Sequence, residues 1–108
     1  MAQYLLIESR DPFESNDVGY YYDLAADLAQ SVNDVTLFLV QNGVLPARSG
    51  VYSERLAKVA QSGATILADD FSLRERAIAA DALIPGVKAA PLEVVVDQLA
   101  AGRKALWH

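Results

Sequence analysis

Short apolar runs alternate with segments of helical periodicity along the whole chain. The apolar runs are mostly continuous, a pattern typical of strands that are buried on both faces of a sheet. The sequence predicts five strands, at residues 4–7, 35–40, 64–68, 87–89 and 104–107. It predicts four helices between them, at residues 17–31, 53–61, 72–83 and 92–101.

Local signals set the helix boundaries and faces. Asn16 or Asp17 can cap the first helix, and Ser72 with Glu75 forms the S-x-x-E pattern typical of a capping box that opens the third. The first helix is expected to turn these apolar side chains inward: Tyr21, Leu24, Ala25 and Leu28.

The order of these elements predicts the architecture. Helical connections of this length suit crossovers between parallel strands. We therefore expect one α/β domain over residues 1–108, a three-layer α/β/α arrangement around a five-stranded, mostly parallel sheet. A chain of 108 residues is long enough to form a core without cross-links.

Composition excludes several kinds of chemistry. The chain has no cysteine, which rules out disulfides, thiolate metal sites and thiol nucleophiles. Its single histidine, His108, is the last residue, where we expect a solvated and frayed side chain. Glycine-rich phosphate-binding motifs are also missing. We accordingly expect no catalytic thiol, no cofactor and no metal site.

The charge distribution bears on partners and location. Nine basic against fourteen acidic residues give a net charge of −5, the opposite of what a nucleic-acid backbone requires. Residues 1–40 hold seven of the acids and a single base. The start of the chain has no basic region typical of a signal peptide, and no apolar run reaches the length of a membrane span. We expect a cytoplasmic protein that binds neither nucleic acid nor membrane.

Polar residues follow three of the predicted strands. In open parallel sheets, ligands bind beyond the carboxyl ends of the strands. We therefore expect a small-ligand site formed by Glu8, Ser9, Gln41, Asn42, Gly43, Asp69 and Asp70. Within it, Gly43 offers either a positive φ or a close backbone approach, and Asn42 tolerates the left-handed region. Alternatively, the glycine turn serves backbone geometry alone.

The two neighbouring aspartates allow two interpretations. As a carboxylate pair, Asp69 and Asp70 could act as acid and base or hold a cation such as Mg²⁺, with Glu8 nearby. In the second interpretation Asp70 and Ser72 cap the third helix and Asp69 is solvated.

Exposed aromatic residues suggest an assembly. Tyr20, Tyr21 and Tyr22 cannot all point inward, because neighbours on a helix lie about 100° apart. Tyrosine is enriched at protein interfaces, so we expect these residues and Trp107 to contribute to a subunit contact.

These residues resemble the DsrE/DsrF/DsrH-like superfamily, small α/β proteins of sulfur relay. Residues 38–44 (FLVQNGV) are similar to the strand and Q/D/E-[DN]-G-V turn of that family, and the order of elements is similar over essentially the whole chain. Residues 67–76 resemble the segment that leads from strand three into a helix with an Arg-Gly pair, but Ala77 follows Arg76 here. Residues 7–13 and 106–107 lean toward the DsrH-like branch.

The resemblance also implies a missing group. In sulfur-transferring members a cysteine near the end of strand three carries persulfide sulfur, and the matching position here falls at Ala68 or Asp69. Neither side chain can form a persulfide. The resemblance thus implies a homologue that is not catalytic in thiol chemistry: an accessory, partner-docking or ligand-binding component that forms a homo-oligomer (trimer or hexamer) or joins related subunits. The alternative is an enzyme or divalent-cation binder that uses Asp69, Asp70 and Glu8.

Overall fold

Five strands form one sheet in a computed structural model that describes residues 1–50 and 53–108. The strands are Gln3–Glu8 (β1), Asp34–Leu39 (β2), Thr65–Asp69 (β3), Val87–Ala90 (β4) and Lys104–Trp107 (β5). The helices are Asp17–Gln30 (α1), Ser53–Gln61 (α2), Asp70–Glu75 (α3) and Glu93–Ala100 (α4), with two 3₁₀ helices, Gln41–Ala47 (η1) and Ala80–Ala82 (η2).

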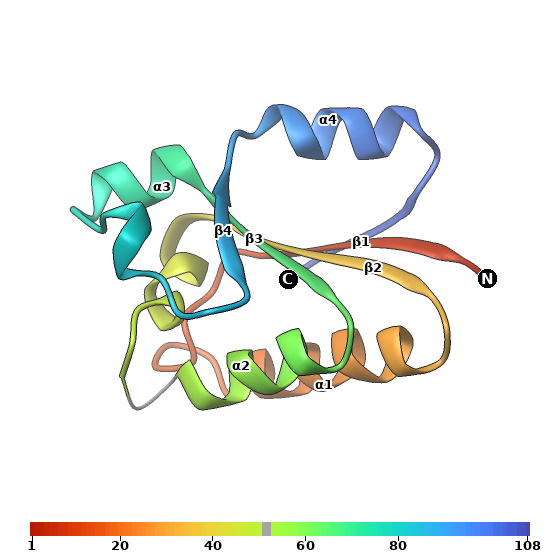
Figure 1. The fold of residues 1–108 in the computed structure, drawn as a ribbon, viewed down its shortest axis with the longest axis horizontal. Coiled ribbons are helices and arrows are strands. Elements are labelled where there is room, and N and C mark those ends of the chain that lie inside the picture. The colour runs from red at the N-terminus through yellow and green to blue at the C-terminus, as the bar shows by residue number, and fades with distance from the viewer. Residues whose placement is uncertain (51–52) are drawn as a thin grey trace.

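The sheet has the strand order β4-β3-β2-β1-β5, and every neighbouring pair is parallel (Figure 1). This confirms the predicted five-stranded α/β fold. Because all strands run the same way, their carboxyl ends lie along one edge of the sheet, which we call the rim. Glu8 pairs in register with Leu39, and Asp69 pairs with Ala90, so the ends of the strands are aligned there.

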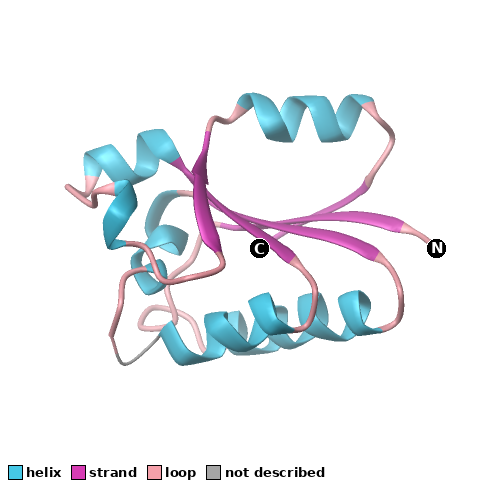
Figure 2. Cartoon of the chain, viewed as in Figure 1, coloured by secondary structure: helices cyan, strands magenta, loops and turns pink. Residues whose placement is uncertain are grey.

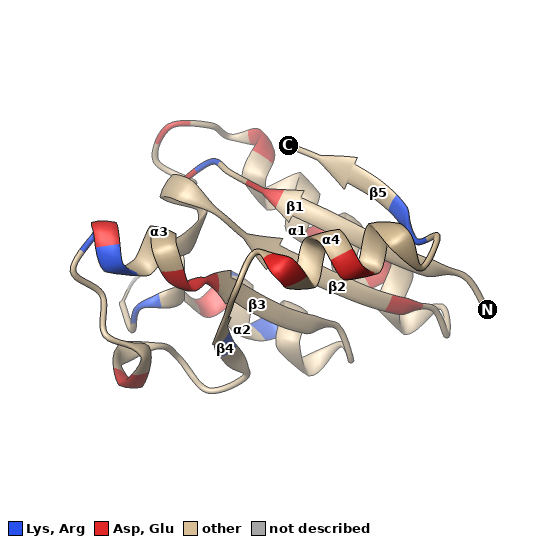
Figure 3. Ribbon diagram, turned by 90° about the horizontal axis from the view of Figure 1, so that it is seen from above, with Lys and Arg blue, Asp and Glu red and all other residues tan. Residues whose placement is uncertain are grey.

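Helices cover both faces of the sheet, which confirms the three layers (Figure 2). α1 and α2 lie together on one face, over a large core that includes Leu6, Leu37, Leu56 and Ile66. α4 lies on the other face over a smaller core formed by Leu5, Ile7, Phe38, Val40, Ala90 and Val95. α4 extends over β1 and β2, and on that face Leu67 of β3 is half-buried and Lys88 of β4 is exposed (Figure 3).

The inward face of α1 differs from the prediction at one position. Tyr21 and Ala25 are buried and Leu28 is partly buried, as predicted, but Leu24 is 39% exposed. Val18 and Tyr22 are buried instead. The buried stripe of α1 is therefore centred on residues 18, 21, 22 and 25, and Leu24 lies outside it.

The predicted third helix is too long. α3 ends at Glu75 because Ala77 adopts a positive φ of 54°. The Ala77 N–H then donates to the Arg74 carbonyl at 3.1 Å, and the Ile78 N–H donates to the Leu73 carbonyl at 2.9 Å. These two bonds form a Schellman motif, which terminates a helix and buries Ile78 against the core.

The predicted capping box is also wrong. Ser72 does not cap the helix; it lies inside α3, and Asp69 occupies the N-cap position. In the described part of the chain, no helix is long and apolar enough to cross a membrane.

Candidate functional site

The polar loops that follow β1, β2 and β3 meet at the rim, as the sequence predicted. The Glu8 carbonyl accepts a hydrogen bond from the Val40 N–H at 3.0 Å, which ties the end of β1 to the end of β2. The Gln41 N–H donates to the Ser72 hydroxyl at 2.8 Å, and Ser72 in turn bonds to Asp69. A chain of hydrogen bonds therefore links the ends of three strands.

Gly43 serves a close backbone approach. A Cβ atom at this position would collide with the main-chain oxygen of Glu8. The left-handed residue of this turn is Gln41, with a φ of 52°, so neither Gly43 nor Asn42 takes the positive φ that the sequence allowed there. The turn therefore packs directly against β1, so its glycine is required by sterics.

Glu8 and His108 form a buried pair at the rim. The Glu8 side chain is fully buried, and its Oε2 atom lies 2.8 Å from Nδ1 of His108. Oε1 accepts from the Arg10 main-chain N–H at 2.9 Å. The His108 ring stacks on Tyr21, with 5.2 Å between the ring centroids. The expectation of a solvated, frayed His108 is wrong, because β5 pairs with β1 and brings its last residue beside Glu8.

Burial controls the electrostatics of this pair. Desolvation raises the pKa of Glu8, while the hydrogen bond from the Arg10 N–H and the contact with His108 lower it in part. Burial also raises the pKa of Tyr21, and the nearby charge of Glu8 adds to this effect.

Ser9 and Trp107 close the same corner of the rim. The Ser9 hydroxyl donates to the main-chain oxygen of His108 at 2.9 Å, and Trp107 Nε1 donates to the Ser9 oxygen at 3.3 Å. Ser9 therefore bonds to the main chain of His108 and to the side chain of Trp107, and it holds the end of β5 against the end of β1.

Asp69 is a buried helix cap. Its Oδ2 atom accepts from the Ser72 N–H at 3.0 Å and from the Ser72 hydroxyl at 2.7 Å. Asp69 is 6% exposed, so the expectation of a solvated side chain is wrong. Its other oxygen, Oδ1, is buried without a hydrogen-bond partner among the described residues.

The neighbouring Asp70 points to a different partner. It forms a half-exposed ion pair with Arg74 at 3.8 Å, one helical turn along α3. Among residues 1–50 and 53–108, no three His, Cys, Asp or Glu side chains are grouped so that they could hold a metal ion.

Asn42 is held by an arginine that sequence reasoning did not place at the site. Its Oδ1 atom accepts from Nε and Nη2 of Arg76, at 3.1 and 2.9 Å. Arg76 was singled out only as part of the family-like segment after strand three. The Schellman turn at the end of α3 is what brings it to the η1 turn.

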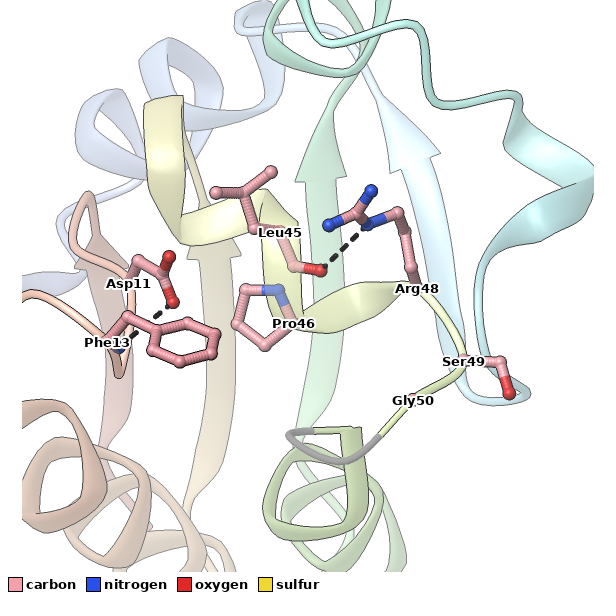
Figure 4. Close-up of a pocket in the computed structure, with 7 residues that line it drawn as sticks. All are labelled: Asp11, Phe13, Leu45, Pro46, Arg48, Ser49 and Gly50. Atoms are coloured by element: carbon pink, nitrogen blue, oxygen red, sulfur yellow. Dashed lines mark hydrogen bonds between the residues drawn. The ribbon is translucent and has the colours of Figure 1, made fainter.

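A cavity lies next to the rim residues. Its volume is about 320 Å³, and it lies between the β1–α1 loop on one side and the end of η1 with the residues that follow it on the other (Figure 4). Phe13 points toward Pro46, and the Arg48 Nε donates to the Leu45 carbonyl at 3.4 Å. The cavity is lined by Asp11, Phe13, Leu45, Pro46, Arg48, Ser49 and Gly50.

None of the seven predicted ligand residues lines this cavity. They lie at the strand ends and bond mostly to residues outside the predicted set. Glu8 and Ser9 bond to His108, Gln41 and Asp69 bond to Ser72, and Asn42 bonds to Arg76. The loops that project beyond them form the hollow. The sequence signal for it was modest: Pro46 and Gly50 mark an irregular segment, but nothing in the local pattern places that segment opposite Phe13.

Two of the four predicted interface aromatics are internal. Tyr21 and Tyr22 are buried within the subunit, at 9% and 1% exposure, because they belong to the inward stripe of α1. Tyr20 and Trp107 are 75% and 70% exposed. Only these two can present their rings to another molecule without rearrangement.

Comparisons with known proteins show the fold. The sequence matches no protein-family profile and no curated protein. Among solved structures, the chain resembles the ychN protein from E. coli, with a TM-score of 0.87, 21% identity and full coverage of both chains. It also resembles MTH1491, a protein of unknown function from Methanobacterium thermoautotrophicum, with a TM-score of 0.84, 17% identity and full coverage of both chains.

A third structure agrees. BT1422, a conserved protein of unknown function from Bacteroides thetaiotaomicron, has a TM-score of 0.80 and 16% identity, over 98% of this chain and 94% of its own. At these identities the likeness concerns the fold. This chain thus has the same architecture as these three proteins, two of which are described as being of unknown function.

Proposed function

We propose that this chain is a cytoplasmic DsrE-like protein of sulfur relay or a related branch of sulfur metabolism, and that it acts as an accessory component without carrying sulfur itself. Its likeness to small α/β proteins such as ychN over the whole chain agrees with the DsrE-like segment order. The motifs at residues 38–44 and 67–76 are the sequence support for the family.

The observation that carries the proposal is Asp69 at the end of β3. The resemblance places the sulfur-carrying cysteine of active members at Ala68 or Asp69, and the chain contains no cysteine anywhere. Asp69 caps α3 through two bonds to Ser72, and these bonds support the Gln41 turn. A carboxylate at this position stabilises the rim but cannot accept sulfane sulfur.

The remaining polar groups of the rim also have structural partners. Glu8 bonds to His108 and Arg10, and Asn42 bonds to Arg76. A general acid or base must be within reach of a substrate, and these side chains are directed at the protein itself. The rim residues are therefore better suited to hold the loops around the cavity in place than to catalyse a reaction.

We further propose that copies of the chain assemble through the face that carries α4. This helix buries Val95 against the sheet yet leaves Leu92, Val96 and Leu99 on its surface, 48–61% exposed. These three residues follow a spacing of four and three, so they form one apolar stripe on the outer side of the helix. An apolar stripe of this kind is typical of a subunit contact.

Affinity capture tests the proposed function. The tagged chain, expressed at its native level, is isolated and its partners are identified by mass spectrometry. We expect cysteine-bearing DsrE-like proteins or sulfurtransferases to be retained by the chain. A Val96→Glu variant serves as the matched control, because it keeps the rim and alters the proposed contact face. Retention of unrelated proteins only, or of none, contradicts the proposal.

A further inference from the structure

A second cavity lies at the N-terminal end of α1 and is lined by other residues of the β1–α1 loop than the first. Its volume is about 180 Å³. α1 and α2 contribute to it together with that loop, and the two helices lie side by side beneath the sheet (Figure 1). The cavity is lined by Pro12, Ser15, Asn16, Gly19, Tyr22 and Arg55.

A buried hydroxyl on the cavity wall has no partner. The Tyr22 side chain is 1% exposed, and its hydroxyl makes no hydrogen bond within the described part of the chain. A buried donor that lacks an acceptor is unfavourable, and native proteins rarely keep one without a bound molecule or a functional reason. Tyr22 is one of the few such groups here, and it lines this cavity.

The N-terminus of α1 opens at the same place. This helix has 14 residues, and its N-cap residue, Asn16, makes no side-chain capping bond to it in the described structure. The Val18 N–H donates to the Ser15 carbonyl at 3.4 Å. The other main-chain N–H groups of the first turn have no partner within the helix, and the helix dipole concentrates positive potential there. Helix N-termini of this type bind small anions.

Arg55 adds a full positive charge to this end of the helix. Its guanidinium lies against Gly19 in the first turn of α1, so closely that a Cβ atom at Gly19 would overlap it. It forms an ion pair with Asp23 at 3.6 Å, in which both side chains are more than half exposed. Such a surface pair is weak, and a cation next to a helix N-terminus is repelled by the dipole.

We infer that this cavity binds a small oxyanion, such as sulfate, sulfite, thiosulfate or phosphate. The Tyr22 hydroxyl, the Arg55 guanidinium and the N–H groups at the start of α1 are the donors. An oxyanion accepts hydrogen bonds in several directions, so one ligand satisfies all three groups. This inference is independent of the proposed function.

The surroundings limit which anions can enter. Asp11 lies in the adjoining loop and Asp17 in the first turn of α1, and residues 1–40 carry seven acids against one base. The negative charge of these acids repels extended polyanions, whereas a compact anion can still reach the hydrogen-bond donors of the cavity. The size of the cavity agrees, because about 180 Å³ suits a few heavy atoms with water.

Amide chemical shifts test the site directly. The full ¹⁵N-labelled chain is titrated with sodium sulfate, sulfite, thiosulfate and phosphate in turn, at an ionic strength kept constant with sodium chloride. We expect saturable shifts of the amides at residues 15–19 with at least one of these salts. Tighter binding of the sulfur oxyanions or of phosphate then identifies which of the two classes is the ligand.

Three variants separate a built site from general attraction. Arg55→Gln is expected to weaken binding about tenfold or more, because it removes a charged donor. Tyr22→Phe is expected to weaken binding several-fold without lowering the thermal midpoint measured in the absence of anion, since it removes a buried hydroxyl that makes no bond there. Arg48→Gln removes a cation at the neighbouring cavity and should bind as the wild type does.

Several results would overturn the inference. The absence of saturable shifts at residues 15–19 with all four salts excludes an oxyanion site at this cavity. Equal weakening by Arg48→Gln and Arg55→Gln shows attraction by net charge alone. Wild-type affinity in the Tyr22→Phe variant removes the buried hydroxyl from the site.

Discussion

At the scale of single residues, Gly43 has the tightest steric constraint at the rim. The turn after β2 packs on the backbone of β1, and the main-chain oxygen of Glu8 occupies the space that a side chain at Gly43 would need. The obstructing atom belongs to the backbone of a central strand and is held there by the Val40 N–H. It therefore cannot move aside as the end of a flexible side chain would.

The Gly43→Ala variant should be destabilised by about 2 kcal/mol, in the range expected when a well-packed interior is overfilled. Denaturant unfolding measures this difference. Gly50→Ala is the matched control, because among the described residues no atom beyond its chain neighbours lies within 4 Å of a Cβ built there. Equal stability of the two variants would contradict the close approach.

Glu8 is the second residue whose surroundings determine its properties. Its pKa is raised above its ordinary value of 4.5 by burial. The folded protein then holds the proton more tightly than the unfolded chain does. The contribution of Glu8 to stability is therefore complete below pH 4.5 and is lost as the pH rises through the folded-state pKa.

Replacing Glu8 with glutamine removes this titration. We expect the difference in melting temperature between Glu8→Gln and the wild type to shift in favour of the variant as the pH rises from 4.5 toward neutrality. Thermal unfolding over a series of pH values measures it. His108→Gln should show a steeper loss of stability than the wild type, because His108 lowers the pKa of Glu8. A pH-independent difference for both variants would contradict the buried pair.

At the scale of elements, the end of α3 shows how one turn shapes the site. Ala77 takes a left-handed conformation that glycine adopts more readily, and the two Schellman bonds stop the helix there. The chain then turns so that Ile78 enters the core while Arg76 reaches Asn42. The early termination of α3 thus places an arginine at the rim.

Ala77→Gly should stabilise the protein by about 1 kcal/mol, because glycine has no Cβ atom and adopts the left-handed conformation without steric strain. Chemical denaturation measures this gain. Ala79→Gly is the matched control: Ala79 has a φ of −73°, so glycine there only adds freedom to the unfolded chain and should lower stability slightly. A loss of stability in both variants would contradict the left-handed turn.

At the scale of the whole molecule, the two faces of the sheet are covered unequally. Two helices bury one face over the larger core, whereas α4 covers the other over the smaller one (Figure 3). On this second side Leu92, Val96, Leu99 and Trp107 are all exposed. A second copy of the chain seated on this side would bury them.

We expect the wild-type chain to be an oligomer at micromolar concentration and Val96→Glu to shift it toward smaller species. The physical reason is that a charge in the centre of an apolar contact loses its hydration on assembly. Light scattering after size exclusion measures the mass of each. Val32→Glu, which changes an exposed valine outside α4, should leave the mass unchanged. A monomeric wild type contradicts the proposed assembly.

The sequence alone determined the elements and their arrangement in layers. The continuous run at residues 35–40 and the helical segment at residues 53–61 are local patterns, because burial on one or both faces repeats with the period of the element. These patterns predicted the five strands, the α/β class and the meeting of the Glu8, Asn42 and Asp69 loops. Composition by itself excluded a thiol.

Only the tertiary structure decided which side chains those loops bond to. Glu8 and His108 are 100 residues apart, and they meet because β5 pairs with β1 at the edge of the sheet. Tyr22 is buried in place of Leu24 for a related reason, since the sheet fixes how α1 is rotated. The periodicity of a sequence predicts which face of an element is buried, but it does not predict which element packs against that face. The neighbouring element determines the hydrogen bonds, cavities and charges of the site.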